Sequence, residues 1–200
     1  REPIQPHNLT YTALGAAMLW VGWFGFNAGS ELLSDDLTSS AFAVTHFSAA
    51  AGAVAWALTE WVVLKKPTVL GASSGAVAGL VCITPAAGFV GPMSALVMGA
   101  AGGFVCYFAC TTIKAKFRYD DSLDAFGVHG ICGIWGAVAT GILANPAVNE
   151  AGTGLLYGNP KQVVIQLIGV GATIAYAAVA TFILASITKV ITGGLRVSEE

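Results

Sequence analysis

Long uncharged stretches dominate the pattern of hydrophobic and polar positions along this chain. Five of them lie between charged residues, and each exceeds the roughly 20 apolar residues that a membrane-spanning helix needs. The longest, residues 67–113, is interrupted at Pro85 and Pro92, and proline does not continue a helix from its interior. The pattern therefore predicts six transmembrane helices, over residues 9–30, 39–63, 67–85, 92–113, 124–144 and 162–190.

The composition agrees with a chain whose main solvent is lipid. Hydrophobic residues make up 56% of the 200 residues and charged residues only 10%, whereas soluble domains carry roughly 25% charged residues. The mean hydropathy is +0.73. The net charge is −2, and no basic cluster is interleaved with aromatic residues, so nothing indicates a nucleic-acid partner. We therefore expect an all-α membrane protein in the lipid bilayer, folded as a single domain over residues 1–200.

Basic residues are concentrated on one predicted side of the membrane. If the first residue lies on that side, the side holds eight of the nine basic residues, namely Arg1, Lys65, Lys66, Lys114, Lys116, Arg118, Lys189 and Arg196. The opposite side holds Lys161 and the acidic residues Glu31, Asp35, Asp36 and Glu150. Cytoplasmic loops carry an excess of lysine and arginine. We therefore predict that both ends of this chain are cytoplasmic and that the protein lies in the cytoplasmic or plasma membrane.

The sequence contains no pattern that predicts catalysis or a cofactor. A phosphate-binding loop, a dinucleotide fingerprint and a nucleophile with a suitably spaced base are all absent. Cys82, Cys106, Cys110 and Cys132 lie inside predicted helices, where cysteine packs as a small hydrophobe. Cys106 and Cys110 share a helix face, but two thiols without a further ligand are a weak metal signal. We expect neither enzymatic activity nor a cofactor or metal.

Small residues mark the third predicted helix. Gly71, Gly75 and Gly79 follow one another at intervals of four residues. Such a stripe lets two helix backbones approach closely in a membrane. We therefore predict tight helix packing along it.

The most informative stretch is DAFGVHGICGIWG, at residues 124–136. Its glycines recur at every third position and leave a broad part of the helix backbone bare. His129 lies among them, and an imidazole at membrane depth must face protein or water. Such a histidine either serves a function or holds two helices together by a hydrogen bond. The glycines favour a lined path beside His129, whereas the alanine-rich surroundings of His46 favour a structural or interfacial role.

A second candidate site is GWFGFNAGSE, residues 22–31, at the predicted external end of the first helix. Phe26 and Ser30 share one helix face, and Trp23 stands three residues before Phe26. Aromatic rings attract a small cation, and a serine oxygen accepts a hydrogen bond from it. The same pattern is typical of an aromatic belt that anchors a membrane interface, and periodicity alone favours the belt.

Three acidic residues, Asp120, Asp121 and Asp124, precede or begin the fifth predicted helix. Carboxylates at this position complement the positive end of a helix and can pair with the nearby Arg118. We therefore predict a structural role for them.

Four segments together resemble the ammonium transporter family, which comprises the Amt, Mep and Rh proteins. They are GWFGFNAGS at 22–30, VLGASSGAVAGLV at 69–81 followed by Thr84 and Pro85, DDSLDAFGVHG at 120–130, and GLRV at 194–197. They are spread over nearly the whole chain in the order found in the family, which makes the resemblance more specific than any one motif.

The resemblance implies an eleven-helix fold whose first ten helices form two inverted halves, assembled as homotrimers with a pore in each subunit. This chain resembles the sixth to eleventh helices, the C-terminal half. Phe26 matches the outer phenylalanine gate contributed by this half, and Trp23 and Ser30 match residues around an external ammonium recruitment site. His129 matches the second of the twin pore histidines. Asp121 and Asp124 match acidic residues beside the helix that carries this histidine, and a structural role is kept for them.

The implied function is ammonium transport: NH4+ is recruited at the aromatic and serine site, deprotonated, and conducted as NH3, with proton relay past His129. The N-terminal half of the fold, with the partner histidine, is not among these residues, so we expect the chain to be incomplete as a channel. Many bacterial and archaeal members of the family also have a cytoplasmic tail that helps to bind the PII signalling protein. The alternatives are an ammonium sensor coupled to a signalling domain, a scaffold subunit that binds no ammonium, and a channel for neutral gases as in the Rh branch.

Overall fold

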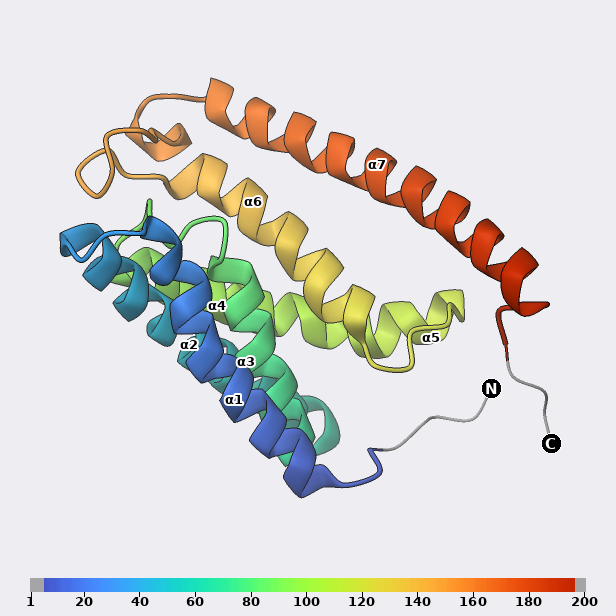
Figure 1. Ribbon diagram of the computed structural model, residues 1–200. Helices are drawn as coiled ribbons and strands as arrows, with labels where there is room; N and C mark the ends of the chain where they lie inside the picture. Colours follow the sequence, from blue (N-terminus) through green and yellow to red (C-terminus); the bar gives the residue numbers. More distant parts are fainter. Residues whose placement is uncertain (1–5, 197–200) are drawn as a thin grey trace.

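The computed structural model describes residues 6–196, and all regular secondary structure in that range is helical (Figure 1). The helices are α1 Leu9–Asn27, α2 Asp36–Leu64, α3 Val69–Ile83, α4 Pro92–Phe108, α5 Lys114–Phe117, α6 Cys132–Leu143 and α7 Lys161–Thr192. Two π-helical segments, η2 Ala109–Ile113 and η3 Phe126–Ile131, precede α5 and α6, and 3-10 turns cover Gly29–Glu31 (η1) and Leu155–Tyr157 (η4). Arg1 and Val197, which belong to the charge bias and to the last matching segment, lie outside the described residues.

The predicted all-α membrane fold is confirmed, and the third helix is shorter than expected. Five spans within residues 6–196 are long and apolar enough to cross a membrane, namely Leu9–Glu31, Asp36–Leu64, Pro92–Phe117, Phe126–Leu143 and Lys161–Thr192. The third predicted helix becomes α3, which has 15 residues. At 1.5 Å per residue it is roughly 22 Å long, shorter than the ~30 Å hydrocarbon core.

Polar side chains and proline start the helices where the sequence places them. Asn8, Asp35 and Thr68 each accept a hydrogen bond from the backbone N–H three residues later, at 3.1, 2.9 and 2.9 Å, and so cap α1, α2 and α3. Pro92 occupies the first turn of α4, where its missing N–H costs no helical hydrogen bond. These residues divide the uncharged stretches into separate helices.

The core is a seam of glycines where α2, α3 and α4 meet. A Cβ atom added to Gly79 of α3 would overlap the carbonyl oxygen of Ser48 on α2 and would lie 2.9 Å from the Cα of Ala49. A Cβ atom on Gly99 of α4 would lie 2.7 Å from the Cα of the same residue, Ser48. The Ser48 hydroxyl donates to the Gly79 carbonyl at 2.7 Å. The prediction of close packing along the third helix is therefore confirmed at Gly75 and Gly79, both of which touch α2 backbone.

A buried carboxylate ties α2 to the start of α3. Glu60 is 7% exposed and accepts from the backbone N–H of Thr68 at 2.7 Å and from its hydroxyl at 3.0 Å. The indole N–H of Trp56 also donates to it, at 3.4 Å. Gly71 is the point of close approach here, because a Cβ atom at that position would overlap the carboxylate. Gly71, the first glycine of the stripe, thus faces a side chain instead of a backbone.

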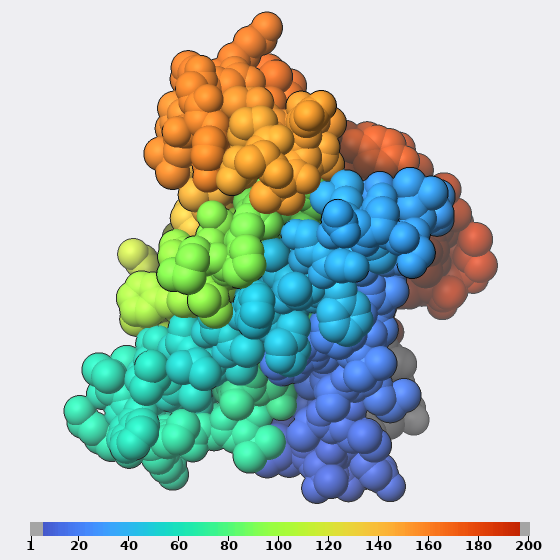
Figure 2. Space-filling view, turned by 90° about the vertical axis from the view of Figure 1, so that its left-hand side faces the viewer, coloured from blue at the N-terminus to red at the C-terminus, as the bar shows by residue number. Residues whose placement is uncertain are grey.

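Two helices lie at the edges of the bundle. Within the described residues α1 and α7 contain no buried residue. α1 packs across α3 and α2, while α7 runs beside α6, which leans on α3 and α4 (Figure 1). Figure 2 shows α2 crossing one face of the molecule and the loop of residues 145–160 projecting at one end. The apolar faces of α1 and α7 remain open to lipid or to further protein.

The cysteines depart in part from the expectation. Cys82 and Cys110 are unpaired and buried, as expected of small hydrophobes. Cys106 and Cys132, from α4 and α6, form a disulfide with their Cα atoms 6.5 Å apart. The i, i+4 neighbour Cys110 is not the partner of Cys106. Sequence spacing within one helix gave no sign of this contact between two helices.

Candidate functional site

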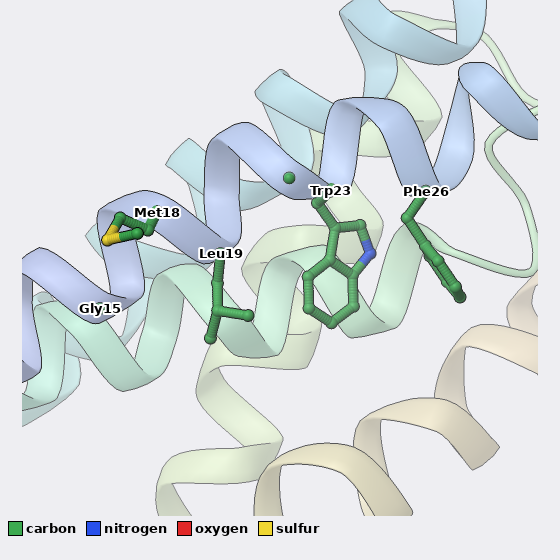
Figure 3. Close-up of a pocket in the computed structure, with 6 residues that line it drawn as sticks. Gly15, Met18, Leu19, Trp23 and Phe26 are labelled. Atoms are coloured by element: carbon green, nitrogen blue, oxygen red, sulfur yellow. The ribbon is translucent and has the colours of Figure 1, made fainter.

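An apolar groove runs along one face of α1. Gly15, Met18, Leu19, Gly22, Trp23 and Phe26 line it, and its volume is about 560 Å³ (Figure 3). Gly15 and Gly22 have no atom within 4 Å of an added Cβ, so the groove is open beside them. The side chains of Trp23 and Phe26 project from α1 toward the same side. The sequence-predicted aromatic pair therefore lines one surface.

Trp23 is the central residue of this surface. Its ring lies edge-on to Phe26, with ring centroids 5.7 Å apart and planes at 66°. It also stacks on His129, with centroids 6.5 Å apart and planes at 23°. Both distances fall in the range of interacting aromatic pairs. The structure thus brings Phe26, Trp23 and His129 into one file, although the sequence separates the first two from the histidine by four helices.

His129 stands on a π-helical segment. The sequence predicts a continuous helix over 124–144, whereas the structure has η3 before α6. π-helical turns insert one residue into a helix and occur frequently at functional sites. The His129 side chain is exposed on the file of rings, and Gly133, one turn later, has nothing within 4 Å of an added Cβ. The imidazole is therefore accessible on the open side of the described chain.

Ser30 lies just beyond the end of α1, on the turn η1. Its hydroxyl donates to the carbonyl of Phe26, four residues earlier. This hydrogen bond uses the only proton of the hydroxyl and leaves its lone pairs to accept. Ser30 is exposed, so its oxygen is available as an acceptor at the end of α1 that carries Phe26.

The acidic residues fix the start of η3. One carboxylate oxygen of Asp121 accepts from the backbone N–H groups of Phe126 and Gly127, at 3.0 and 3.2 Å. Asp124 forms an ion pair with Lys114 at 2.7 Å. Lys114, one turn earlier, takes the place of the expected Arg118 in this pair, and Arg118 ends α5 in a left-handed conformation with φ 53°. These contacts support the structural role.

A second ion pair and an aromatic contact surround the same loop. Arg196, after α7, pairs with Asp120 at 3.2 Å. Tyr119 lies edge-on to Phe126, with centroids 5.7 Å apart, and its hydroxyl donates to the Ala109 carbonyl at 3.5 Å. Burial, followed by the negative charge of Asp121, raises the pKa of Tyr119. Its hydroxyl therefore stays protonated at neutral pH and keeps its donor.

His46 lies in a different aromatic group. Its ring centroid is 5.3 Å from that of Trp20, 6.1 Å from Phe24 and 6.3 Å from Phe47. None of these rings belongs to the Phe26, Trp23 and His129 file. The expectation of a structural or interfacial role for His46 stays a prediction.

Sequence reasoning missed one residue of the site. In the sequence Thr84 stands out only beside Pro85, at the end of a segment that resembles the family. In the structure its hydroxyl accepts from the indole N–H of Trp23 at 2.7 Å. The two residues lie 61 positions apart, so no local spacing could indicate the contact.

Comparisons with known proteins address the family directly. A profile described as "Ammonium Transporter Family" matches residues 1–200. An ammonium transporter of Bacillus subtilis is 50% identical over 196 residues, which cover 98% of this chain and 48% of that protein. An ammonium transporter of Aquifex aeolicus is 53% identical over 196 residues, 98% of this chain and 46% of the relative. The chain thus spans about half the length of the curated relatives it matches.

Solved structures show the same fold. Candida albicans Mep2 superposes with a TM-score of 0.90 at 32% identity, covering 99% of this chain and 45% of that one. A structure named Sensor Amt Protein gives a TM-score of 0.84 at 27% identity, covering 96% and 49%. The family match over the whole chain, the identity of half the residues to named transporters and the shared helical fold show that this chain belongs to the ammonium transporter family.

Proposed function

We propose that the complete protein moves ammonium across a cytoplasmic or plasma membrane, and that the file Phe26, Trp23 and His129 forms one wall of its path. The observation that carries this proposal is the contact between the aromatic end of α1 and the histidine of η3. The relatives named ammonium transporters are 50% and 53% identical over nearly all of this chain. Transport is a property of the complete protein, of which these residues are a part.

The cost of removing NH4+ from water explains why ammonium loses its proton before it enters the path. A bare cation pays a Born cost of order 20 kcal/mol in the idealised limit and several kcal/mol in practice when it leaves water for a low-dielectric interior. Neutral NH3 pays no such cost. An apolar groove such as that beside α1 therefore favours NH3 over NH4+, and deprotonation must precede entry.

The external end of the file is suited to hold the cation before that step. The exposed Phe26 ring attracts a cation by roughly 0.5–2 kcal/mol, and the Ser30 oxygen accepts a hydrogen bond from its N–H. The hydrogen bond from the Ser30 hydroxyl to the Phe26 carbonyl uses the hydroxyl proton and leaves the oxygen free to accept. Trp23 lies inward of Phe26 and closes the surface toward His129.

His129 is proposed to hydrogen-bond NH3 and to relay the proton. Imidazole is both donor and acceptor near neutral pH, which suits it to both tasks. Its exposed ring lies against Trp23 of α1, a helix that has no buried residue in the described chain. We propose that the remainder of the fold supplies the partner histidine and the second wall there.

Assembly and regulation follow from the family resemblance. We propose a homotrimer with one path in each subunit, and a cytoplasmic tail that takes part in binding the PII signalling protein. The start of α1 and the ends of α2, α5 and α7 lie on one side of the bundle (Figure 1). Lys65, Lys66, Lys114, Lys116 and Lys189 lie at these ends, and we propose that this side faces the cytoplasm.

Uptake of labelled methylammonium by cells that express the complete protein tests the proposal. His129→Ala removes the relay group, and we expect its rate to fall at least about 10-fold, since positioned proton transfer contributes that much or more. Phe26→Ala is expected to weaken discrimination between ammonium and alkali cations. His46→Ala is the matched control, since His46 lies outside the file, and it should retain the wild-type rate. Unchanged rate and selectivity in both His129→Ala and Phe26→Ala would overturn the proposal.

Conduction of the substrate distinguishes a transporter from an ammonium sensor. A protein named Sensor Amt Protein shares the fold at 27% identity, well below the named transporters. A sensor binds ammonium but conducts little, so uptake of labelled methylammonium into liposomes that contain the complete protein distinguishes the two. Methylammonium uptake abolished by His129→Ala supports transport, whereas binding without uptake supports the sensor.

A further inference from the structure

The orientation of the Trp23 ring needs an explanation, because its own helix does not provide one. α1 contains no buried residue in the described chain, and Trp23 itself is only half-buried. A large ring on an open helix face has several accessible rotamers. Nevertheless this ring is stacked on His129 and edge-on to Phe26. Something outside α1 must select the orientation.

Thr84 supplies the missing contact. It follows the last residue of α3 and accepts the indole N–H of Trp23 at 2.7 Å. The Thr84 hydroxyl in turn donates to the Leu80 carbonyl at 2.8 Å. That second bond uses the hydroxyl proton, so the oxygen presents lone pairs to the indole. The β-branched side chain has few χ1 rotamers, which makes it a rigid acceptor.

The same hydrogen bond also removes a donor from the proposed path. An indole N–H is a donor only, and a free one beside His129 would offer NH3 a second hydrogen bond. Because Thr84 takes this donor, the surface presented between Phe26 and His129 is the ring face. A passing NH3 then finds its hydrogen-bonding partner at the imidazole.

We propose that Thr84 is a positioning residue that fixes the indole of Trp23 between Phe26 and His129 and withholds its N–H from the permeating molecule. This inference rests on the proposed transport function. Thr84 itself acts through Trp23. A valine at this position keeps the shape and removes the acceptor, whereas a serine keeps the acceptor.

The transport test compares Thr84→Val with Thr84→Ser in the complete protein. Loss of one neutral hydrogen bond is expected to lower the maximal methylammonium rate about 3- to 10-fold in Thr84→Val, with a smaller change in apparent KM because Phe26 and Ser30, which hold the cation, are both retained. Thr84→Ser should restore most of the rate. In a Trp23→Phe background, which has no indole N–H, Thr84→Val should produce no further loss. A loss of equal size in both backgrounds would mean that Thr84 is merely structural and would overturn the inference.

A spectroscopic test does not depend on transport. The Trp23 indole resonance is assigned in 15N-labelled protein as the signal lost in Trp23→Phe. We expect this signal to move in Thr84→Val and to stay in place in Thr84→Ser, because only valine breaks the hydrogen bond. An unmoved indole signal in Thr84→Val would overturn the inference even if Trp23→Phe is inactive. Failure of the underlying function looks different, since His129→Ala and Phe26→Ala would then both match the wild type.

Discussion

The glycine seam predicts that a single methyl group at Gly79 forces α2 and α3 apart. In Gly79→Ala the new Cβ would overlap the Ser48 carbonyl oxygen and lie 2.8 Å from the Ser48 carbonyl carbon and 2.9 Å from the Ala49 Cα, where ordinary contact begins at 3.4 Å. All three atoms are backbone, so no side-chain rotation relieves the overlap. The helices must separate by about half an ångström or more, because packed interiors leave no spare volume.

The expected cost follows from two contributions. Overpacking of a close-packed interior costs about 1–3 kcal/mol, occasionally more. Separation also lengthens the 2.7 Å hydrogen bond from the Ser48 hydroxyl to the Gly79 carbonyl, and an interhelical bond of this kind contributes roughly 0.6 kcal/mol in a membrane. We therefore expect Gly79→Ala to lower the free energy of unfolding by about 2–4 kcal/mol, or roughly 30-fold or more in the folded-to-unfolded ratio.

Equilibrium unfolding of the complete protein in mixed micelles measures this change. Gly171→Ala on α7 is the matched control, because nothing lies within 4 Å of its added Cβ. We expect the control to stay within about 0.5 kcal/mol of the wild type, as surface substitutions usually do. If Gly79→Ala proved as stable as Gly171→Ala, the close approach of α2 and α3 would be refuted.

Three further substitutions test other contacts. Glu60→Ala leaves the start of α3 without the carboxylate that caps it, and thermal unfolding should show a loss of about 1–3 kcal/mol; Glu60→Gln, which keeps an acceptor, should lose less. Asp121→Ala removes the acceptor for two N–H groups of η3 and should cost about 0.5–2 kcal/mol, with Asp121→Asn intermediate in the same unfolding assay. Gly127→Ala places a methyl group on the sulfur of Cys110, so methylammonium uptake should fall and recover in the double variant with Cys110→Ala; failure to recover would exclude that clash as the cause.

The helices were predictable because their limits are set by local chemistry. Charged residues bound the uncharged stretches, and Asn8, Asp35, Thr68 and Pro92 begin helices through contacts within a few residues. The π-helical segments were not predictable in this way. η2 and η3 pack against each other, and a π turn is selected by such tertiary packing instead of by the sequence of the turn itself.

The candidate site was predictable in its parts but not in its assembly. Spacing indicated a shared face for Phe26 and Ser30, and the glycines singled out His129. The stacking of Trp23 on His129 and its bond to Thr84 join three different helical elements. Contacts between distant segments leave no periodic signal, and the disulfide between Cys106 and Cys132 was missed for the same reason.

The brevity of α3 has a consequence for how the chain enters a bilayer during synthesis. A segment of 15 residues spans too little of the hydrocarbon to partition as an independent unit. α7 has 32 residues, which is long enough for it to enter the bilayer from the translocon on its own. It contacts mainly α6. We therefore expect α3 to insert into the bilayer together with α2 and α4, which pack against it. The last helix, α7, is expected to insert independently.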